Sequence, residues 1–281
     1  MIDPIAVPKG ELGKGTGAEV TIFPSLESLY DAFESHLANL ITSRASEGRH
    51  AVVVFPVGPI QFRRLARRFN REGISCRNLY VFTMDEYCDA EGRLVPETHP
   101  LSLRGFFRRE FLEVLDPDKR LPESHWMGPE PENLDAYSRR IDELGGIDVV
   151  YTGFGINGHW AFNDPPEPGE IVDLEQFRNL PARMVSLSRE TVTQTAMGGT
   201  GGDLLLVPPK AVTIGIRELM SARLVYCLMI RSWHSAVIRR ALHGPVTPAF
   251  PASLIQLHSN VVVTLTDSVA DLPEVLVLQR L

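Results

Sequence analysis

Cysteine is scarce in this sequence, and long apolar runs are missing from it. The three cysteines, Cys76, Cys88 and Cys227, are far apart and lack the paired spacing of a disulfide framework or a zinc site. No run approaches the roughly 18 uninterrupted apolar residues of a membrane span, and the first residues lack the apolar core of a secretory signal. These absences predict a cytoplasmic protein without a membrane partner.

An excess of positive charge is also missing. The chain has 28 Lys and Arg residues against 35 Asp and Glu residues, which gives a formal net charge of -7. Nucleic acids and anionic membranes attract basic surfaces, so this balance argues against nucleic acid as a partner. Arginine pairs such as Arg63-Arg64 and Arg239-Arg240 are interpreted as solvated helix faces.

The length of 281 residues, with 44% hydrophobic and 22% charged residues, fits one α/β domain over residues 1–281. Residues up to about Gly17 are expected to form a flexible tail. Short apolar runs alternate with amphipathic helical segments, and this alternation predicts a Rossmann-like, open and mostly parallel sheet with helices on both faces. Two stretches without such a pattern, 165–181 and 198–202, are expected to be mobile loops near the site.

The expected elements follow from these runs. Strands are predicted over residues 20–23, 51–55, 79–83, 147–152, 212–214, 224–230 and 261–265. Helices are predicted over residues 26–45 with Ser25 as the N-terminal cap, in a basic segment ending near 70, and over 101–114, 133–144 and 232–242.

A glycine-rich segment, Gly153 to Asp164, directly follows the apolar run 147–152. Its three glycines satisfy the spacing of a dinucleotide-binding fingerprint, which requires a helix that begins there and faces a pyrophosphate. Pro165, Pro166 and Pro168 exclude a helix of useful length. The preferred interpretation is a glycine-built loop that presents His159 at the carboxyl end of a strand, where open α/β sheets carry their chemistry.

Asp85, His159 and Asp164 follow the ends of two different predicted strands, and such a set can move protons on a small polar substrate. Each residue also has a structural interpretation, because a histidine can be a satisfied core group and Asp85-Glu86 can cap a helix or turn. Asn157 is either a turn residue or the side chain that orients the imidazole of His159. Ser186 and Ser188 are interpreted as caps, since neither has the surroundings of a nucleophilic serine.

Five motifs in the same order carry a family resemblance. They are Met84-Asp85-Glu86-Tyr87, His99-Pro100-x-Ser102, Gly153-x-Gly155-x-Asn157-Gly158-His159-x-Ala161-Phe162-Asn163, Val207-Pro208 with Thr213-Ile214-Gly215, and Leu254-x-x-Leu257-His258. In order and spacing they resemble the glucosamine-6-phosphate deaminase (isomerase) family, from about residue 20 to 270. The wider superfamily also contains 6-phosphogluconolactonases.

The resemblance implies a cofactor-free and metal-free deaminase that acts on a sugar or sugar phosphate. Asp85 corresponds to the base that moves a proton from C2 to C1, and His159 to the group that assists ring opening. Asp164 occupies the position of a family glutamate, and Asn157 is a permitted orienter of the histidine. Family members are often oligomers, so a homo-oligomer is expected. The substrate-binding positions implied by the resemblance are Val57, Gly58, Glu86, Gly155, Gly158 and Lys210.

The chain departs from the family where a phosphate should bind. A hydroxyl-rich loop is replaced by Pro56-Val57-Gly58-Pro59-Ile60, a family arginine aligns with Met197, and a family lysine aligns with Pro209, so that Lys210 and Arg217 are the nearby cations. Proline cannot donate a backbone hydrogen bond. The sequence therefore predicts a sugar deaminase or aldose-ketose isomerase with altered specificity. A lactonase-like hydrolase and a non-catalytic sugar-binding protein are the alternatives.

Overall fold

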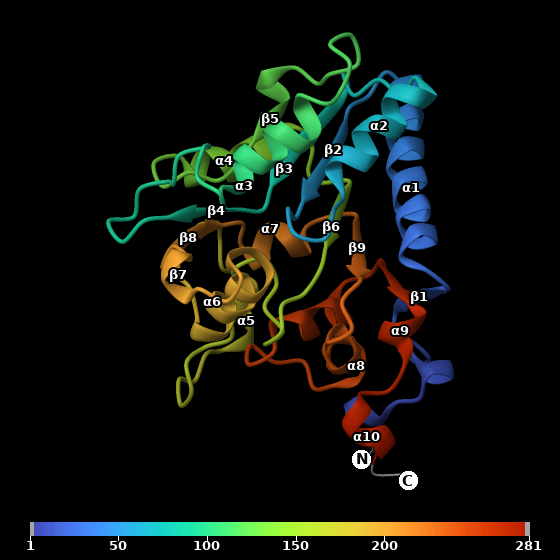
Figure 1. The fold of residues 1–281 in the computed structure, drawn as a ribbon, viewed down its shortest axis with the longest axis vertical. Coiled ribbons are helices and arrows are strands. Elements are labelled where there is room, and N and C mark those ends of the chain that lie inside the picture. The colour runs from blue at the N-terminus through green and yellow to red at the C-terminus, as the bar shows by residue number, and fades with distance from the viewer. Residues whose placement is uncertain (1–2, 279–281) are drawn as a thin grey trace.

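The computed structural model describes residues 3–278 and has a seven-stranded sheet at its centre (Figure 1). The strands lie in the order β1-β10-β9-β6-β2-β3-β5, and every neighbouring pair is parallel. This arrangement confirms the predicted α/β fold class. The bounds of these strands are β1 (Ala18–Phe23), β2 (Ala51–Phe55), β3 (Leu79–Thr83), β5 (Trp126–Met127), β6 (Val149–Thr152), β9 (Leu224–Met229) and β10 (Val261–Thr266).

The helices connect these strands and begin close to where the sequence predicts them. Ser25 caps the first helix as expected, because its side chain accepts a hydrogen bond from the Ser28 amide. The bounds are α1 (Leu26–Ser46), α2 (Phe62–Glu72), α3 (Leu103–Phe107), α4 (Leu134–Glu143), α5 (Leu174–Arg178), α6 (Arg189–Thr195), α7 (Ile216–Met220), α8 (His234–His243), α9 (Asp267–Ala270) and α10 (Glu274–Leu278).

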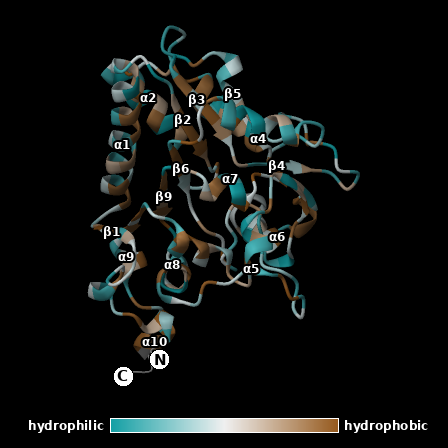
Figure 2. Ribbon diagram, turned by 180° about the vertical axis from the view of Figure 1, so that it is seen from behind, coloured by the Kyte–Doolittle hydropathy of each residue, from teal (hydrophilic) through white to brown (hydrophobic). Residues whose placement is uncertain are grey.

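Both faces of the sheet are covered by helices, and β2 shows how the sequence achieves this. Val52 and Val54 belong to a buried cluster with residues of α4, α7 and α8, whereas Ala51, Val53 and Phe55 belong to a second cluster with residues of α1, α2 and α3. Successive strand residues point to opposite faces, so a continuous apolar run is buried on both. Figure 2 shows the apolar strands inside and hydrophilic residues on the outer helices.

A second, three-stranded sheet was not expected. It contains β4 (Asp85–Cys88), β8 (Lys210–Thr213) and β7 (Arg183–Ser186) in the order β4-β8-β7, with antiparallel pairing. The run predicted at 212–214 therefore lies in this small sheet. Because β4 begins one residue after Met84, the chain changes sheets immediately beyond the carboxyl end of β3. Four-residue strands with mixed polarity carry little periodic signal, which is why the sequence did not reveal β4 and β7.

The segment through Gly17, expected as a flexible tail, packs against the body in the described part of the chain. It forms two short 3-10 turns, Pro4–Ala6 and Lys9–Glu11, and Leu12 is buried. The expected loops also contain local structure, since α5 lies within 165–181 and a π-helical turn, Ala196–Thr200, overlaps 198–202.

The strand order identifies where a ligand site is expected. From β2 the chain moves to β3 and β5 on one side, and from β6 it moves to β9 and β10 on the other. Adjacent strands whose connections depart in opposite directions leave a crevice beyond their carboxyl ends. The loops after β2 and β6 border this crevice, and these are the two loops that the sequence marked by Pro56-Val57-Gly58-Pro59 and by His159.

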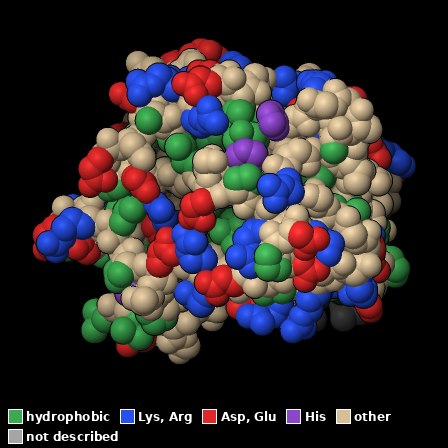
Figure 3. Space-filling view, turned by 90° about the horizontal axis from the view of Figure 1, so that it is seen from above, with side chains coloured by type: hydrophobic (Ala, Val, Ile, Leu, Met, Phe, Trp, Pro, Cys, Tyr) green, Lys and Arg blue, Asp and Glu red, His purple; other side chains and the backbone are tan. Residues whose placement is uncertain are grey.

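The outer surface carries charges of both signs. In the view from above (Figure 3), Lys and Arg side chains are interspersed with Asp and Glu side chains over the visible face. Within residues 3–278, no helix is both long and apolar enough to cross a membrane.

Candidate active site

A cavity of about 230 Å³ opens at the crevice between the loops after β2 and β6. Its walls come from residues 56–59, from Met84, Asp85 and Tyr87 around the start of β4, from Gly153 and Phe154 after β6, and from Ala161 and Phe162 in the following loop. Further walls come from Leu103 of α3, from Gln194 and Thr195 of α6, and from Ile230, Arg231, Trp233 and His234 after β9. Most of this lining is apolar. The few polar groups in it can therefore fix the orientation of a bound ligand.

Asp85 is the acid that lines this cavity. Its exposed fraction is 8%, and it pairs across the small sheet with Thr213, whose hydroxyl donates to Asp85 Oδ1 at 2.5 Å. The Phe162 amide donates to the same oxygen at 3.3 Å. Burial raises the pKa of Asp85 to about 7, although both hydrogen bonds lower it. A carboxyl with this pKa can hold or release a proton near neutral pH, as a general base requires.

Replacing Thr213 with Val is expected to raise the pKa of Asp85. The hydroxyl stabilises the charged carboxylate, so its loss favours the protonated form. One hydrogen bond of this kind shifts the pKa of a carboxyl by about one unit. The acid limb of the activity profile, expected near pH 7 in the wild type, should move to higher pH in Thr213→Val. The control is Thr264→Val, which removes a buried hydroxyl that donates to the Cys227 carbonyl. An unchanged acid limb in Thr213→Val would contradict the assignment.

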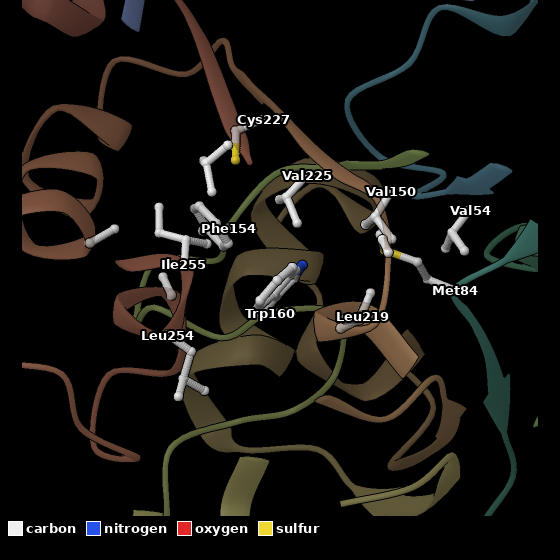
Figure 4. Packing of buried hydrophobic residues seen from close by; sticks show 14 of the residues in the cluster. Val54, Met84, Val150, Phe154, Trp160, Leu219, Val225, Cys227, Leu254 and Ile255 are labelled. Carbon is white, nitrogen blue, oxygen red and sulfur yellow. The ribbon is translucent and has the colours of Figure 1, made fainter. Parts of the chain in front are cut away.

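The loop that carries His159 is anchored by aromatic packing. Trp160 is fully buried, and its ring meets Phe154 edge to face with centroids 5.8 Å apart. Figure 4 shows Trp160 and Phe154 among apolar residues that include Leu219, Leu254 and Ile255. The Gly155 amide donates to the His159 carbonyl, which closes the loop. This packing fixes the backbone on both sides of His159, as a glycine-built presenting loop requires.

Gly155 and Gly158 do not line the cavity, contrary to the prediction that they contact the substrate. Their roles in this loop are steric. A Cβ at Gly155 would lie 2.0–2.3 Å from atoms of the His159 ring, so glycine makes room for the imidazole. Gly158 has φ +83°, and a Cβ there would lie 2.5 Å from the Phe250 ring. The described residues 153–173 contain no helix, as expected from the prolines and contrary to a dinucleotide-binding turn.

His159, Asn157 and Asp164 come together behind Phe154, Ala161 and Phe162 of the cavity wall, and none of the three is itself in the lining. The Asn157 side chain accepts from the His159 amide at 3.1 Å and donates to Asp164 Oδ1 at 2.9 Å. Asn157 therefore holds the histidine backbone and the carboxylate. Of the two interpretations from the sequence, the direct hydrogen bond to the imidazole is not present. Burial raises the pKa of Asp164, but contacts with His159 and hydrogen bonds from Thr191 and Asn157 outweigh it and hold the pKa well below its usual range.

Phe162 links this group to Asp85. Its amide reaches Asp85, and its ring centroid lies 6.4 Å from that of His159. The preceding residue, Ala161, has φ +53°, the one positive value at a non-glycine position among residues 3–278. Such backbone geometry is costly and recurs at functional sites. Here it turns the Phe162 amide toward the carboxylate that lines the cavity.

Glu86 is a helix cap, which corrects its predicted role in substrate binding. The side chain is fully buried and accepts four hydrogen bonds, from the Tyr87, Leu103 and Arg104 amides and from the Ser102 hydroxyl. These donors include the free N–H groups at the start of α3. The capping alternative is thus correct for Glu86 and not for its neighbour Asp85, because adjacent strand residues point to opposite sides.

The prediction that Lys210 binds substrate is also wrong, and the cation that lines the cavity is Arg231. The Lys210 amine donates to the Ala90 carbonyl at the edge of the small sheet, away from the cavity lining, and Arg217 pairs with Glu218. Arg231 is the one Lys or Arg in the lining within residues 3–278, and its guanidinium has no partner there. The signal that could have revealed Arg231 is its place directly after the strand predicted at 224–230, since ligands bind beyond the carboxyl ends of such strands.

The other lining residues fall into two groups. Val57 and Gly58 lie in the cavity wall, and their roles as substrate contacts stay predictions. Their amides have no hydrogen-bond partner among the described residues. The sequence did not predict that Trp233 and His234 line the cavity. Burial lowers the pKa of His234 to about 3, so its ring is neutral. The described part of the chain has no group of three or more His, Cys, Asp or Glu residues suited to a metal ion.

Sequence comparison with known proteins agrees with this geometry. A glucosamine-6-phosphate deaminase of Corynebacterium kroppenstedtii is 30% identical over 239 residues, which cover 83% of this chain and 85% of that protein. The chain belongs to the glucosamine-6-phosphate deaminase family. The predicted resemblance is thereby confirmed, and the protein is an enzyme of this type. No family model matches the sequence.

Solved structures show the same fold. A monomeric glucosamine-6-phosphate deaminase has a TM-score of 0.77 at 24% identity, covering 91% of this chain and all of that one. A 6-phosphogluconolactonase from Thermotoga maritima has a TM-score of 0.63 at 16% identity, covering 89% of this chain and all of that one. These likenesses establish the shared architecture of the deaminase family and the lactonases.

Proposed function

We propose that the protein deaminates an amino sugar and isomerises it from aldose to ketose, with Asp85 as the base. The single observation that carries this proposal is the buried Asp85 carboxyl, with a pKa of about 7, in the wall of the cavity of a deaminase-family protein. Asp85 takes the proton from C2 of the open-chain sugar and returns it to C1, while the C1 oxygen gains a proton and the amine nitrogen loses one. The product is an imine at C2, to which water adds, and ammonia leaves to give the ketose.

His159 serves in this proposal as the group that moves the proton of the ring oxygen. Its ring is largely buried, lies against Gly155, and has Asp164 on its Nδ1 side. The other ring nitrogen, Nε2, has no partner among residues 3–278. An imidazole held by a carboxylate on one side and free on the other suits proton transfer. Asn157 and Asp164 act by holding His159.

Altered specificity is the second part of the proposal. Pro56 and Pro59 cannot donate backbone hydrogen bonds, so within residues 56–59 the Val57 and Gly58 amides are the backbone donors that this part of the lining can offer. Arg231 supplies the positive charge in the lining. The substrate is therefore an amino sugar whose far end meets two amides and one arginine in place of a hydroxyl-rich phosphate loop.

Replacing Arg231 with Met is expected to weaken the binding of phosphorylated sugars selectively. A charge-assisted contact contributes about 1.5–3 kcal/mol, so KM for a phosphorylated substrate should rise by roughly 10- to 100-fold, with a small change for the unphosphorylated form. Steady-state kinetics on matched pairs of sugars measure this difference. Lys210→Met is the control, because that amine lies outside the cavity. A larger effect of the control than of Arg231→Met would contradict the proposed role of Arg231.

The test of the function is a panel of amino sugars and aldoses, each with and without phosphate, assayed for ammonia and ketose. Turnover by the wild type that is lost in Asp85→Asn supports the proposal. Efficient turnover of glucosamine 6-phosphate at ordinary enzyme rates would contradict the altered specificity but not the proposed deaminase activity. Hydrolysis of a sugar lactone without ammonia release would favour the lactonase alternative, and tight sugar binding without turnover would favour a binding protein.

Assembly and location stay predictions. We propose a homo-oligomer that works in the cytoplasm. The support for a reducing location is that Cys76, Cys88 and Cys227 are all free and buried.

A further inference from the structure

We propose that the Thr191 hydroxyl is a positioning group that couples Asp164 to His159 and keeps the imidazole proton on Nδ1. The inference rests on the proposed function, because it concerns how the proton-transfer histidine is held. Thr191 lies in the first turn of α6, and its exposed fraction is 1%. It was not among the residues expected to contribute to the site.

The distances favour a contact through Thr191 over a direct one. His159 Nδ1 and Asp164 Oδ1 are 3.3 Å apart, long for a charge-assisted hydrogen bond. Thr191 Oγ1 lies 2.9 Å from His159 Nδ1 and donates to Asp164 Oδ1 at 2.6 Å. Asp164 Oδ1 also accepts from Asn157 Nδ2 at 2.9 Å. With two short donors on that oxygen, the imidazole meets the hydroxyl more closely than the carboxylate.

The number of hydrogens that Thr191, Asp164 and His159 can share determines where each hydrogen lies. The pKa of Asp164 is held low, so the carboxylate is ionised and accepts only. The single hydrogen of the Thr191 hydroxyl is therefore directed to Asp164. Its oxygen must then accept from His159, which requires a proton on Nδ1. In the neutral ring this leaves Nε2 unprotonated and able to take a proton, and the positive ring can give one back.

One residue holds both partners of this contact. The Ser188 hydroxyl caps α6 by accepting from the Thr191 amide at 3.1 Å, and the Ser188 amide donates to Asp164 Oδ2 at 3.0 Å. The cap thus sets the distance between the hydroxyl and the carboxylate. An aspartate is one methylene shorter than a glutamate, and the inserted hydroxyl bridges the remaining distance to His159.

The test removes the hydroxyl and keeps the shape. In Thr191→Val, nitrogen NMR of the His159 ring should show loss of the tautomer with the proton on Nδ1. By analogy with the loss of a partner that orients a metal-bound histidine, kcat should fall by about 10- to 100-fold. Thr191→Ser should retain both properties. Thr193→Val is the matched control, since its hydroxyl is exposed on the same helix and bonds only the Arg189 carbonyl. Thr191→Ala removes the hydroxyl in a second way if the valine variant does not fold.

A rescue separates positioning from general stability. In the double variant Thr191→Val with Asp164→Glu, the longer carboxylate should reach Nδ1 directly and restore the tautomer. Its kcat should be at least tenfold higher than that of Thr191→Val alone. A Thr191→Val protein with the wild-type tautomer and the activity of Thr193→Val would overturn the inference. So would a double variant no better than the single one. If the tautomer changes as expected but the wild type turns over no sugar, the positioning role stands and the proposed function fails.

Discussion

Asp85→Asn is expected to lower turnover by about 10³-fold and, above neutral pH, to make the protein more stable than the wild type. The loss of activity follows from removal of the base, since general base catalysis commonly contributes 10²- to 10⁴-fold. The amide keeps an oxygen that can accept from Thr213, so the pairing of β4 with β8 is preserved. Kinetic assays should therefore show a fall of about 10³-fold without loss of the fold.

The stability gain follows from the raised pKa of Asp85. A carboxyl that holds its proton more tightly in the folded state stabilises the fold below its unfolded pKa, and this contribution is lost as the pH rises from about 4 through about 7. At pH 8 the buried charge costs the wild type roughly 2–4 kcal/mol, which asparagine avoids. The melting temperature of Asp85→Asn should exceed that of the wild type by about 5–10 °C at pH 8 and by much less at pH 5.

The control for this prediction is Asp142→Asn on the exposed side of α4. Its melting temperature should follow that of the wild type at both pH values. If the difference between Asp85→Asn and the wild type were the same at pH 5 and pH 8, the pKa of Asp85 would not be raised, and its role as a base near neutral pH would lose its support.

Arg239→Met is expected to destabilise the protein by about 3–5 kcal/mol. The interpretation of Arg239 as part of a solvated helix face is wrong, because its guanidinium is fully buried without a carboxylate partner among residues 3–278. It donates to the carbonyls of Val7, Ser235, Val269 and Ala270. These contacts join the N-terminal segment, α8 and α9. Methionine fills a similar space but leaves the carbonyls without a donor, and each unsatisfied buried group costs about 1–3 kcal/mol. Removal of the buried guanidinium charge, whose desolvation is itself costly, offsets part of this sum.

Thermal unfolding measures this loss, which should lower the melting temperature by roughly 10 °C. Limited proteolysis should also cut the segment before Gly17 faster, because its anchor at Val7 is gone. Arg240→Met is the matched control, since that side chain is exposed. Equal melting temperatures for the two variants would mean that Arg239 does not hold the segment in place.

Much of the fold could be predicted from the sequence. The runs at 51–55 and 79–83 coincide with β2 and β3, because continuous apolar residues signal a strand buried on both faces. Ser25 marks the start of α1 through a local hydrogen bond. The glycines and prolines around His159 predicted a loop in place of a nucleotide-binding helix, because steric limits of single residues act over a few positions.

The composition of the site depended on contacts that no local pattern contains. Asp85 meets Thr213 across 128 positions of the sequence, and Asp164 meets Thr191 across 27. The small antiparallel sheet that brings Asp85 to Thr213 consists of strands too short to show a period. Likewise, Arg231 enters the cavity only because β9 lies beside β6.

The sequence by itself therefore determined the α/β class, the family and the acid and histidine at the strand ends. The tertiary structure decided which of two adjacent acids faces the cavity, which cation lines it and how Asp164 reaches His159. The physical reason is range. Periodicity, capping and turn preferences act between neighbours in the chain, whereas burial, pKa and hydrogen-bond partners arise where distant segments meet.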